Sequence, residues 1–83
     1  MRSISRRSPN GFGVKRALEH LGFITLNQEK QKGMTLLVHP IENDFCFLWA
    51  SNEPISSVYM DIILYSSGVT YEEMEKTGVL YNP

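Results

Sequence analysis

The 83-residue sequence has one cysteine, Cys46, and no long hydrophobic run. A lone cysteine excludes an intramolecular disulfide framework and favours a reducing compartment. A helix that spans a bilayer needs roughly 20 consecutive apolar residues, and no segment of this chain approaches that length. We therefore predict a cytoplasmic protein that does not associate with membranes, with Cys46 in its core.

Sequence patterns that carry catalytic chemistry are also missing. The chain has no phosphate-binding loop, zinc ribbon, nucleophile elbow or dinucleotide fingerprint. His39 is a weak catalytic candidate, because Glu42 and Asp44 follow it across a turn. Two carboxylates beside one imidazole on a solvated turn are more often a surface polar cluster than a metal or acid–base site. The sequence predicts no metal and no cofactor.

Basic residues are almost absent from the second part of the chain. The formal net charge is −1, but residues 1–32 hold seven of the eight Lys and Arg residues, and residues 33–83 hold Lys76 with seven acidic residues. We interpret residues 1–10 as a flexible basic arm and residues 11–83 as a single α+β domain. Contacts to RNA, if the protein makes them, are expected at the basic residues: Arg2, Arg6, Arg7, Lys15, Arg16, Lys30 and Lys32.

The order of the periodic segments predicts the fold. Residues 14–21 carry apolar side chains at helical spacing and stop before Gly22, a residue that commonly ends helices. Three short apolar segments follow (residues 23–27, 34–39 and 45–50), and the turns between them are typical of antiparallel hairpins. Two further helices complete the pattern. The sequence therefore predicts a two-layer α+β sandwich: a helix, a three-stranded antiparallel meander and two helices.

Capping signals delimit the last two helices. Gly68 ends the first of them, whose N-cap is expected at Ser51 or Asn52. Helical spacing predicts its buried face: Ile55, Val58, Tyr59, Ile62 and Ile63. Thr70 and Glu73 form a capping box, so the last helix is expected to begin there.

The second and third predicted strands are apolar on both faces. Because the helices of a two-layer sandwich cover one side of the sheet, the other side would expose apolar surface. The candidate protein-interface residues lie on these two strands: Leu37, Leu48, Phe45, Phe47 and Trp49. Alternation leaves open which face is exposed, and we expect one of Leu37 and Leu48 on the exposed side. Either a protein partner covers that side, or residues 79–81 fold back over it.

Three segments of the sequence resemble landmarks of a known family. The first helix ends in Gly and an aromatic residue (ALEHLGF), and a Lys-Gly pair precedes a strand that ends in His-Pro (KGMTLLVHP). A helix then leads through a Gly-containing turn into a short acidic helix (MDIILYSSGVTYEEMEKTG). Over about residues 14–78 the chain is similar to the HicA-type toxins, which are small messenger-RNA interferases with a double-stranded-RNA-binding-like fold.

The resemblance implies a catalytic His directly after the Gly of the second strand. This chain instead has Met34 and Thr35 after Gly33, and neither a thioether nor a hydroxyl acts as an acid or base near pH 7. His39 lies roughly 13 Å beyond Thr35 along an extended strand and does not reach that position. Catalysis by the family's route is therefore not expected.

We interpret the chain as a small intracellular binding or regulatory protein without catalytic activity, which contacts another protein or forms a homodimer. One alternative is an RNA-binding protein, or a messenger-RNA interferase with an altered active site, that uses the basic N-terminal region. Another alternative is an inhibitor encoded by a phage or mobile element, which fits the small size and the lack of catalytic motifs.

Overall fold

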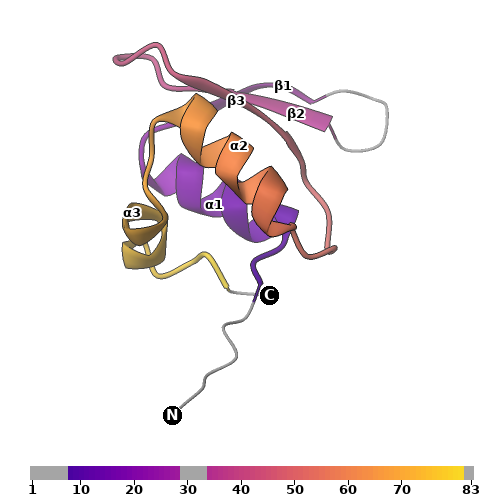
Figure 1. Ribbon diagram of the computed structural model, residues 1–83. Helices are drawn as coiled ribbons and strands as arrows, with labels where there is room; N and C mark the ends of the chain where they lie inside the picture. Colours follow the sequence, from indigo (N-terminus) through magenta and orange to yellow (C-terminus); the bar gives the residue numbers. More distant parts are fainter. Residues whose placement is uncertain (1–7, 29–33, 82–83) are drawn as a thin grey trace.

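The computed structural model describes residues 8–28 and 34–81, and over these residues the predicted α+β fold is confirmed. Helix α1 (Gly11–His20) is followed by strands β1 (Ile24–Gln28), β2 (Met34–Val38) and β3 (Phe45–Trp49), and then by helices α2 (Ser57–Ser67) and α3 (Tyr71–Lys76). The strands form one antiparallel sheet in the order β1-β2-β3. Figure 1 shows the helices below this sheet.

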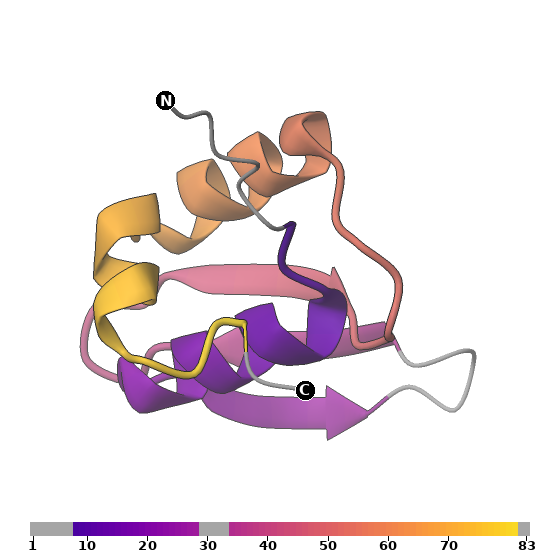
Figure 2. The same ribbon diagram turned by 90° about the horizontal axis from the view of Figure 1, so that it is seen from below.

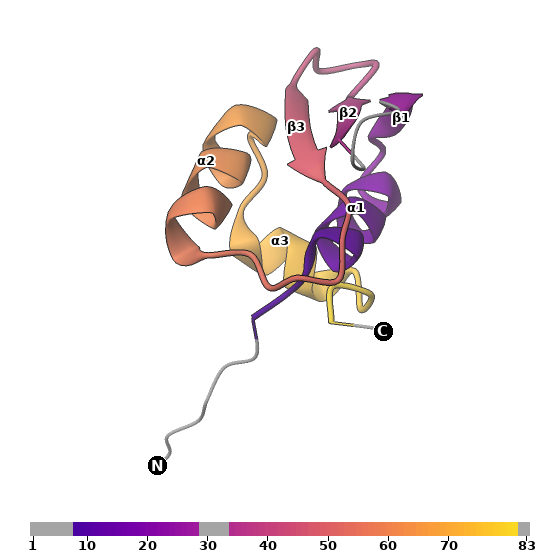
Figure 3. The same ribbon diagram turned by 90° about the vertical axis from the view of Figure 1, so that its right-hand side faces the viewer.

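The helices differ in how they meet the sheet. Seen from below, α1 crosses in front of the strands and α2 runs alongside β3 (Figure 2), and the view from the side places α2 next to the edge of β3 (Figure 3). The hydroxyl of Tyr59 in α2 accepts a hydrogen bond from the backbone N–H of Trp49, with N and O 3.3 Å apart. Helix α2 therefore shields the sheet edge that β3 forms.

Helix α1 begins earlier than predicted, at Gly11. Asn10 is its N-cap, and the side-chain oxygen of Asn10 accepts a hydrogen bond from the N–H of Gly13 at 2.8 Å. Pro9 is buried, and its carbonyl accepts a hydrogen bond from the N–H of Ile55 at 2.9 Å. Residues 9 and 10 therefore belong to the folded domain and not to the predicted arm of residues 1–10. Residues 1–7 lie outside the described part of the chain.

Helix α2 begins later than predicted. Its N-cap is Ser56 rather than Ser51 or Asn52. The segment before it is held against the N-terminal part of the chain, where Pro54 forms an isolated antiparallel bridge with Asn10. That pairing keeps residues 51–55 out of the helix, so a more distant serine caps it.

The buried face of α2 also differs from the prediction. Its buried residues are Met60, Ile63 and Ser67. Val58 and Ile62, which helical spacing predicts as buried, are exposed. A helix beside a sheet edge contacts its neighbours over a narrower stripe than a helix lying under the sheet, and this position explains the difference.

The remaining helix ends follow the local signals in the sequence. Gly22 and Gly68 have left-handed backbones with φ of 103° and 74° after α1 and α2, a conformation that suits glycine. Thr70 and Glu73 form the predicted capping box at the start of α3, with the side chain of each accepting a hydrogen bond from the backbone N–H of the other. These predictions are confirmed.

The core lies between the sheet and the helices. Leu37, Cys46 and Leu48 point into it and are fully buried, whereas Phe45 and Phe47 on the opposite side are exposed. The prediction that one of Leu37 and Leu48 is exposed is wrong, because the antiparallel register places both on the helix side. Neither leucine can contribute to an interface of the folded chain.

The last described residues pack on the helix side of the sheet. Leu80 is buried, and its backbone oxygen lies so close to α1 that a Cβ on Gly13 would be 2.0 Å from it. The hydroxyls of Tyr71 and Tyr81 hydrogen-bond to each other. The alternative in which residues 79–81 cover the exposed side of the sheet is therefore wrong.

Substitution of Gly13 tests this close approach. In an open helix, alanine is favoured over glycine by about 1 kcal/mol, but at residue 13 a Cβ would meet the backbone of Leu80. We expect Gly13→Ala to lower the free energy of unfolding by about 1–3 kcal/mol in urea denaturation. His20→Ala, at an exposed position of the same helix, should change it by less than about 0.5 kcal/mol. A more stable Gly13→Ala protein would contradict the packing.

Candidate functional site

The side of the sheet away from α1 forms an apolar surface, here named the outer face. Its members on β2 and β3 alternate with core residues, and the register pairs them across the two strands. On β1, Ile24 pairs with Val38, and the exposed Leu26 lies at a bulge without a partner of its own. The face thus comprises Ile24, Leu26, Met34, Leu36, Val38, Phe45, Phe47 and Trp49. Among the strand side chains that the structure describes, none that points to this side is charged. A surface of this composition is suited to contact with another apolar surface.

Strand β3 gives the outer face a row of aromatic side chains. Phe45, Phe47 and Trp49 are 50%, 55% and 44% exposed. The rings of Phe45 and Phe47 meet edge to face with centroids 6.2 Å apart, an arrangement that the charge distribution of aromatic rings favours. Because this contact already restrains the rings, less side-chain entropy is lost when a partner covers them.

The rest of the outer face is aliphatic. Ile24 and Leu26 of β1 are 49% and 62% exposed, and Leu26 lies at a bulge where the pairing of β1 with β2 shifts register. Met34, Leu36 and Val38 fill the middle row and are partly covered by their neighbours. The face therefore carries aromatic rings along β3 and aliphatic side chains along β1 and β2.

Sequence reasoning found the aromatic row but missed the five aliphatic members of the outer face. Their signal was present as alternation in β2, where Met34 and Leu36 flank Thr35, which is buried in the core. Alternation pairs residues on a face but does not say which face is covered when both are apolar. The side of the strand that carries Leu37 is the covered one, but this follows from the position of α1, which alternation does not give.

His39 has a structural role in the β2–β3 turn. Its Nδ1 accepts hydrogen bonds from the backbone N–H groups of Ile41 and Glu42 at 3.3 and 3.2 Å. Its ring meets Phe23 edge to face with centroids 5.2 Å apart. A neutral imidazole whose Nδ1 accepts two backbone hydrogen bonds carries its proton on Nε2, so neither nitrogen of His39 offers a free lone pair to a substrate in this arrangement.

The other polar groups near His39 do not make a metal site. Within residues 8–28 and 34–81, no group of three or more His, Cys, Asp or Glu side chains is placed to hold a metal ion. Asp44 joins the turn through its backbone carbonyl, which accepts a hydrogen bond from the N–H of His39 at 2.8 Å. The contacts of His39 and Asp44 therefore stabilise the β2–β3 turn.

The structure brings few of the predicted RNA-contacting residues together. Of this set, only Lys15 and Arg16 lie within the described residues. The others lie outside them: Arg2, Arg6, Arg7, Lys30 and Lys32. The ammonium of Lys15 pairs with the carboxylate of Glu19 at 3.0 Å. Burial raises the pKa of Glu19, but hydrogen bonds from Lys15 and Thr25 outweigh it and leave the pKa lowered. Lys15 is thus engaged with an ionised carboxylate.

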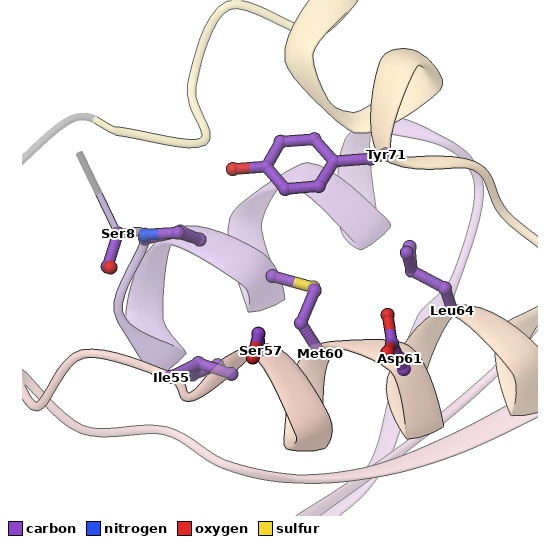
Figure 4. A pocket seen from close by; sticks show the side chains of 8 residues that line it. Ser8, Ile55, Ser57, Met60, Asp61, Leu64 and Tyr71 are labelled. Carbon is purple, nitrogen blue, oxygen red and sulfur yellow. The ribbon is translucent and has the colours of Figure 1, made fainter. Parts of the chain in front are cut away.

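A cavity of about 270 Å³ opens between α2, α3 and the start of the described chain. Figure 4 shows the side chain of Met60 pointing into it, with the ring of Tyr71 on the far side and the carboxylate of Asp61 at its margin. Its other lining residues are apolar or carry hydroxyls: Ser8, Pro9, Ile55, Ser57 and Leu64. No His, Lys or Cys is among these lining residues, so the serine hydroxyls have no nitrogen base beside them of the kind that usually activates a nucleophile.

Comparison with known proteins adds no assignment. A scan against models of protein families finds no match, and no curated protein matches the sequence. Within the described residues, no helix is long and apolar enough to cross a membrane. The resemblance to the HicA-type toxins stays a prediction, and the outer face is the candidate site that the coordinates support.

The role of His39 can be tested by substitution. His39→Ala removes the acceptor for two backbone N–H groups and should lower the free energy of unfolding by about 1–2 kcal/mol. His39→Asn should retain most of the stability, because asparagine side chains accept hydrogen bonds from the same backbone positions in turns. Both variants are compared by urea denaturation. Equal loss in the two variants would contradict the proposed acceptor role.

Cys46 should make the fold sensitive to alkaline pH. Burial raises the pKa of its thiol to about 11 from an ordinary 9.0. Between these values the unfolded chain loses the thiol proton and the folded chain keeps it, so the free energy of unfolding should fall by about 2–3 kcal/mol as pH rises. Below pH 9 the folded and unfolded states both hold the proton, so the thiol does not change the free energy of unfolding with pH.

Cys46→Ala provides the control for the alkaline transition. Denaturation curves over the same pH range should show a smaller loss of stability in this variant, because no thiol remains to titrate. Burial also raises the pKa of Tyr59, so a residual alkaline loss is expected. If the variant and the original chain lost stability equally between pH 9 and 11, Cys46 would not be the responsible group.

Proposed function

We propose that this chain is a non-catalytic binding module that acts through a protein–protein contact on its outer face. One observation carries the proposal: eight apolar side chains, three of them aromatic, form a face that none of the described helices covers. Large contiguous apolar patches are rare on proteins that act as monomers and are typical of interfaces. Aromatic residues are also enriched at the energetic centres of interfaces.

The positions that correspond to the catalytic residues of the HicA-type toxins support a non-catalytic role. Thr35 is only 1% exposed and faces the core, while Met34 belongs to the outer face. His39 uses Nδ1 for the backbone of its own turn. No described residue near these positions supplies the general base that cleavage of RNA would need.

A protein partner fits the outer face better than RNA does. Sheets that bind single-stranded nucleic acid combine stacking aromatics with positive charge that follows the phosphates. The aromatic row of β3 would meet the first requirement, but the remaining described members of the face are aliphatic and none is charged. RNA binding by the basic N-terminal residues stays an alternative, as does an inhibitor from a phage or mobile element.

The cytoplasm is the compartment that we propose for this module. Cys46 is a free, buried thiol with no second cysteine in the sequence. A chain with one cysteine forms no intramolecular disulfide, so its fold does not require an oxidising compartment.

Photo-crosslinking inside the source cell tests the proposed function. The photoreactive analogue p-benzoylphenylalanine replaces Phe47 on the outer face or, as a matched control, Phe12 of α1. Both phenylalanines are exposed, at 55% and 40%, so the analogue is accessible at either position. We expect a defined protein adduct from position 47 that is absent from position 12.

Treatment of the adduct identifies the class of partner. A protein partner gives an adduct whose added mass resists nuclease, and mass spectrometry of its proteolytic fragments then names the crosslinked peptide. An adduct from position 47 that nuclease trims back to nearly the mass of the chain alone would favour the RNA alternative. Equal adducts from both positions, or none from position 47, would contradict a specific contact on the outer face.

A further inference from the structure

We propose that the partner on the outer face is a second copy of this chain, and that the two copies stack sheet on sheet in a symmetric dimer. The inference rests on the proposed function, because both assign a protein contact to the same surface. The dimer would have four layers, with two sheets inside and the helices of each copy outside. Stacked sheets of this kind pack about 10 Å apart with their strands within about 30° of one another.

The area of the outer face matches the need of a stable dimer. Five of its side chains, Ile24, Leu26, Phe45, Phe47 and Trp49, are 44–62% exposed, which corresponds to roughly 500 Å² of apolar surface on each copy. A standard interface takes about 800 Å² from each partner, of which about 60% is apolar. The apolar part of such an interface is thus roughly the surface available, and the described β2–β3 turn (residues 39–44) would supply part of the polar rim.

The absence of charge on the outer face favours a second copy. In a two-fold contact every residue lies near its own counterpart or near the same few residues, so a charged side chain would meet a like charge. The described strand side chains on this face include no charged group. Association of two copies therefore needs no desolvation of charges and creates no repulsion within the contact.

The uneven distribution of aromatic side chains on the face supports one arrangement. The aromatic row lies on β3, at one side of the sheet, and the aliphatic residues of β1 lie at the other. A two-fold axis parallel to the central strand β2 would place Phe47 of each copy over the partner's β1. The aromatic rings of each copy would then meet aliphatic side chains of the other, so the large rings need not stack on one another across the contact.

The edges of the sheet are less suitable for self-association. Helix α2 lies along the β3 edge, where Tyr59 already accepts the hydrogen bond of the Trp49 N–H. At the opposite edge, the bulge at Leu26 disturbs the regular spacing of backbone groups that strand pairing requires. Side chains of the outer face, rather than backbone edges, therefore carry the proposed contact.

Sedimentation of the full chain and matched variants provides the first test. The unsubstituted chain should sediment as a dimer at concentrations where Phe47→Asp is a monomer, since two buried aspartates would weaken association roughly 100-fold or more. Phe12→Asp places the same change on an exposed phenylalanine of α1 and should remain dimeric. Leu26→Asp in β1 should behave as Phe47→Asp does.

Circular dichroism separates loss of the dimer from loss of the fold. Phe47→Asp and Leu26→Asp should keep the far-ultraviolet spectrum of the original chain, because both side chains are about half exposed or more. If Phe47→Asp unfolds, Leu26→Asp, on the other edge of the same face, is used as the test instead. A folded Leu26→Asp protein that still dimerises as tightly as the original chain would overturn the inference.

Crosslinking from the centre of the face provides an independent measurement. Leu36 is the middle residue of the central strand, so a two-fold axis along β2 brings it close to its counterpart. The Leu36→Cys variant should give crosslinked dimers with a short bismaleimide reagent. Cys46 is fully buried and its pKa is raised to about 11, so it should contribute no background. Tyr65→Cys, on the exposed surface of α2, should give little crosslinked product.

The outcomes distinguish this inference from the proposed function. A monomer in sedimentation, together with an adduct to a different protein from position 47, would overturn the second copy and leave the protein-binding function in place. A monomer that forms no protein adduct from position 47 would overturn both. A dimer that dissociates in Phe47→Asp, crosslinks through Leu36→Cys and yields an adduct with its own peptide would support the inference.

Discussion

The close approach of the α1 backbone to two other segments decides the layout of the molecule. Gly11 lies where a Cβ would be 1.9 Å from the carbonyl oxygen of Trp49, and Gly13 lies where a Cβ would be 2.0 Å from that of Leu80. The end of β3 and the end of the described chain therefore both meet the first turn of α1. With these segments drawn to the helix side, nothing in the described chain is left to cover the outer face.

The position of α2 follows from the same arrangement. Residues after β3 pass the start of α1, where the N–H of Phe12 donates to the carbonyl of Ser51 at 3.1 Å and Asn10 pairs with Pro54. The chain reaches α2 only after passing α1, and the helix then lies on the same side of the sheet as α1, along the edge that β3 forms. Shielding of the β3 edge and exposure of the sheet face are thus consequences of one chain path.

Features encoded within a few residues could be predicted from the sequence. The left-handed glycines and the capping box of α3 depend on contacts within one helical turn, so their signals are complete in the local sequence. The three strands and their antiparallel order could also be predicted, because short turns connect them. These elements fixed the fold class without any long-range information.

Features that depend on distant contacts could not be predicted in the same way. Both faces of β2 and β3 are apolar, so alternation alone could not tell that Leu37 and Leu48 belong to the core and Phe47 to the surface. Several serines and an asparagine precede α2, and its N-cap at Ser56 is selected by the bridge between Asn10 and Pro54. In both cases the deciding contact joins residues far apart in the chain.

The distribution of side chains along β2 connects the fold with the proposed binding role. On one side of this strand Thr35 and Leu37 complete the core, and on the other Met34, Leu36 and Val38 build the outer face. Every described position of the strand is thereby committed to packing, and the histidine that follows it stabilises a turn. A strand used in this way has no side chain left for acid–base chemistry, whereas the proposed partner would cover its outward side and complete the sandwich.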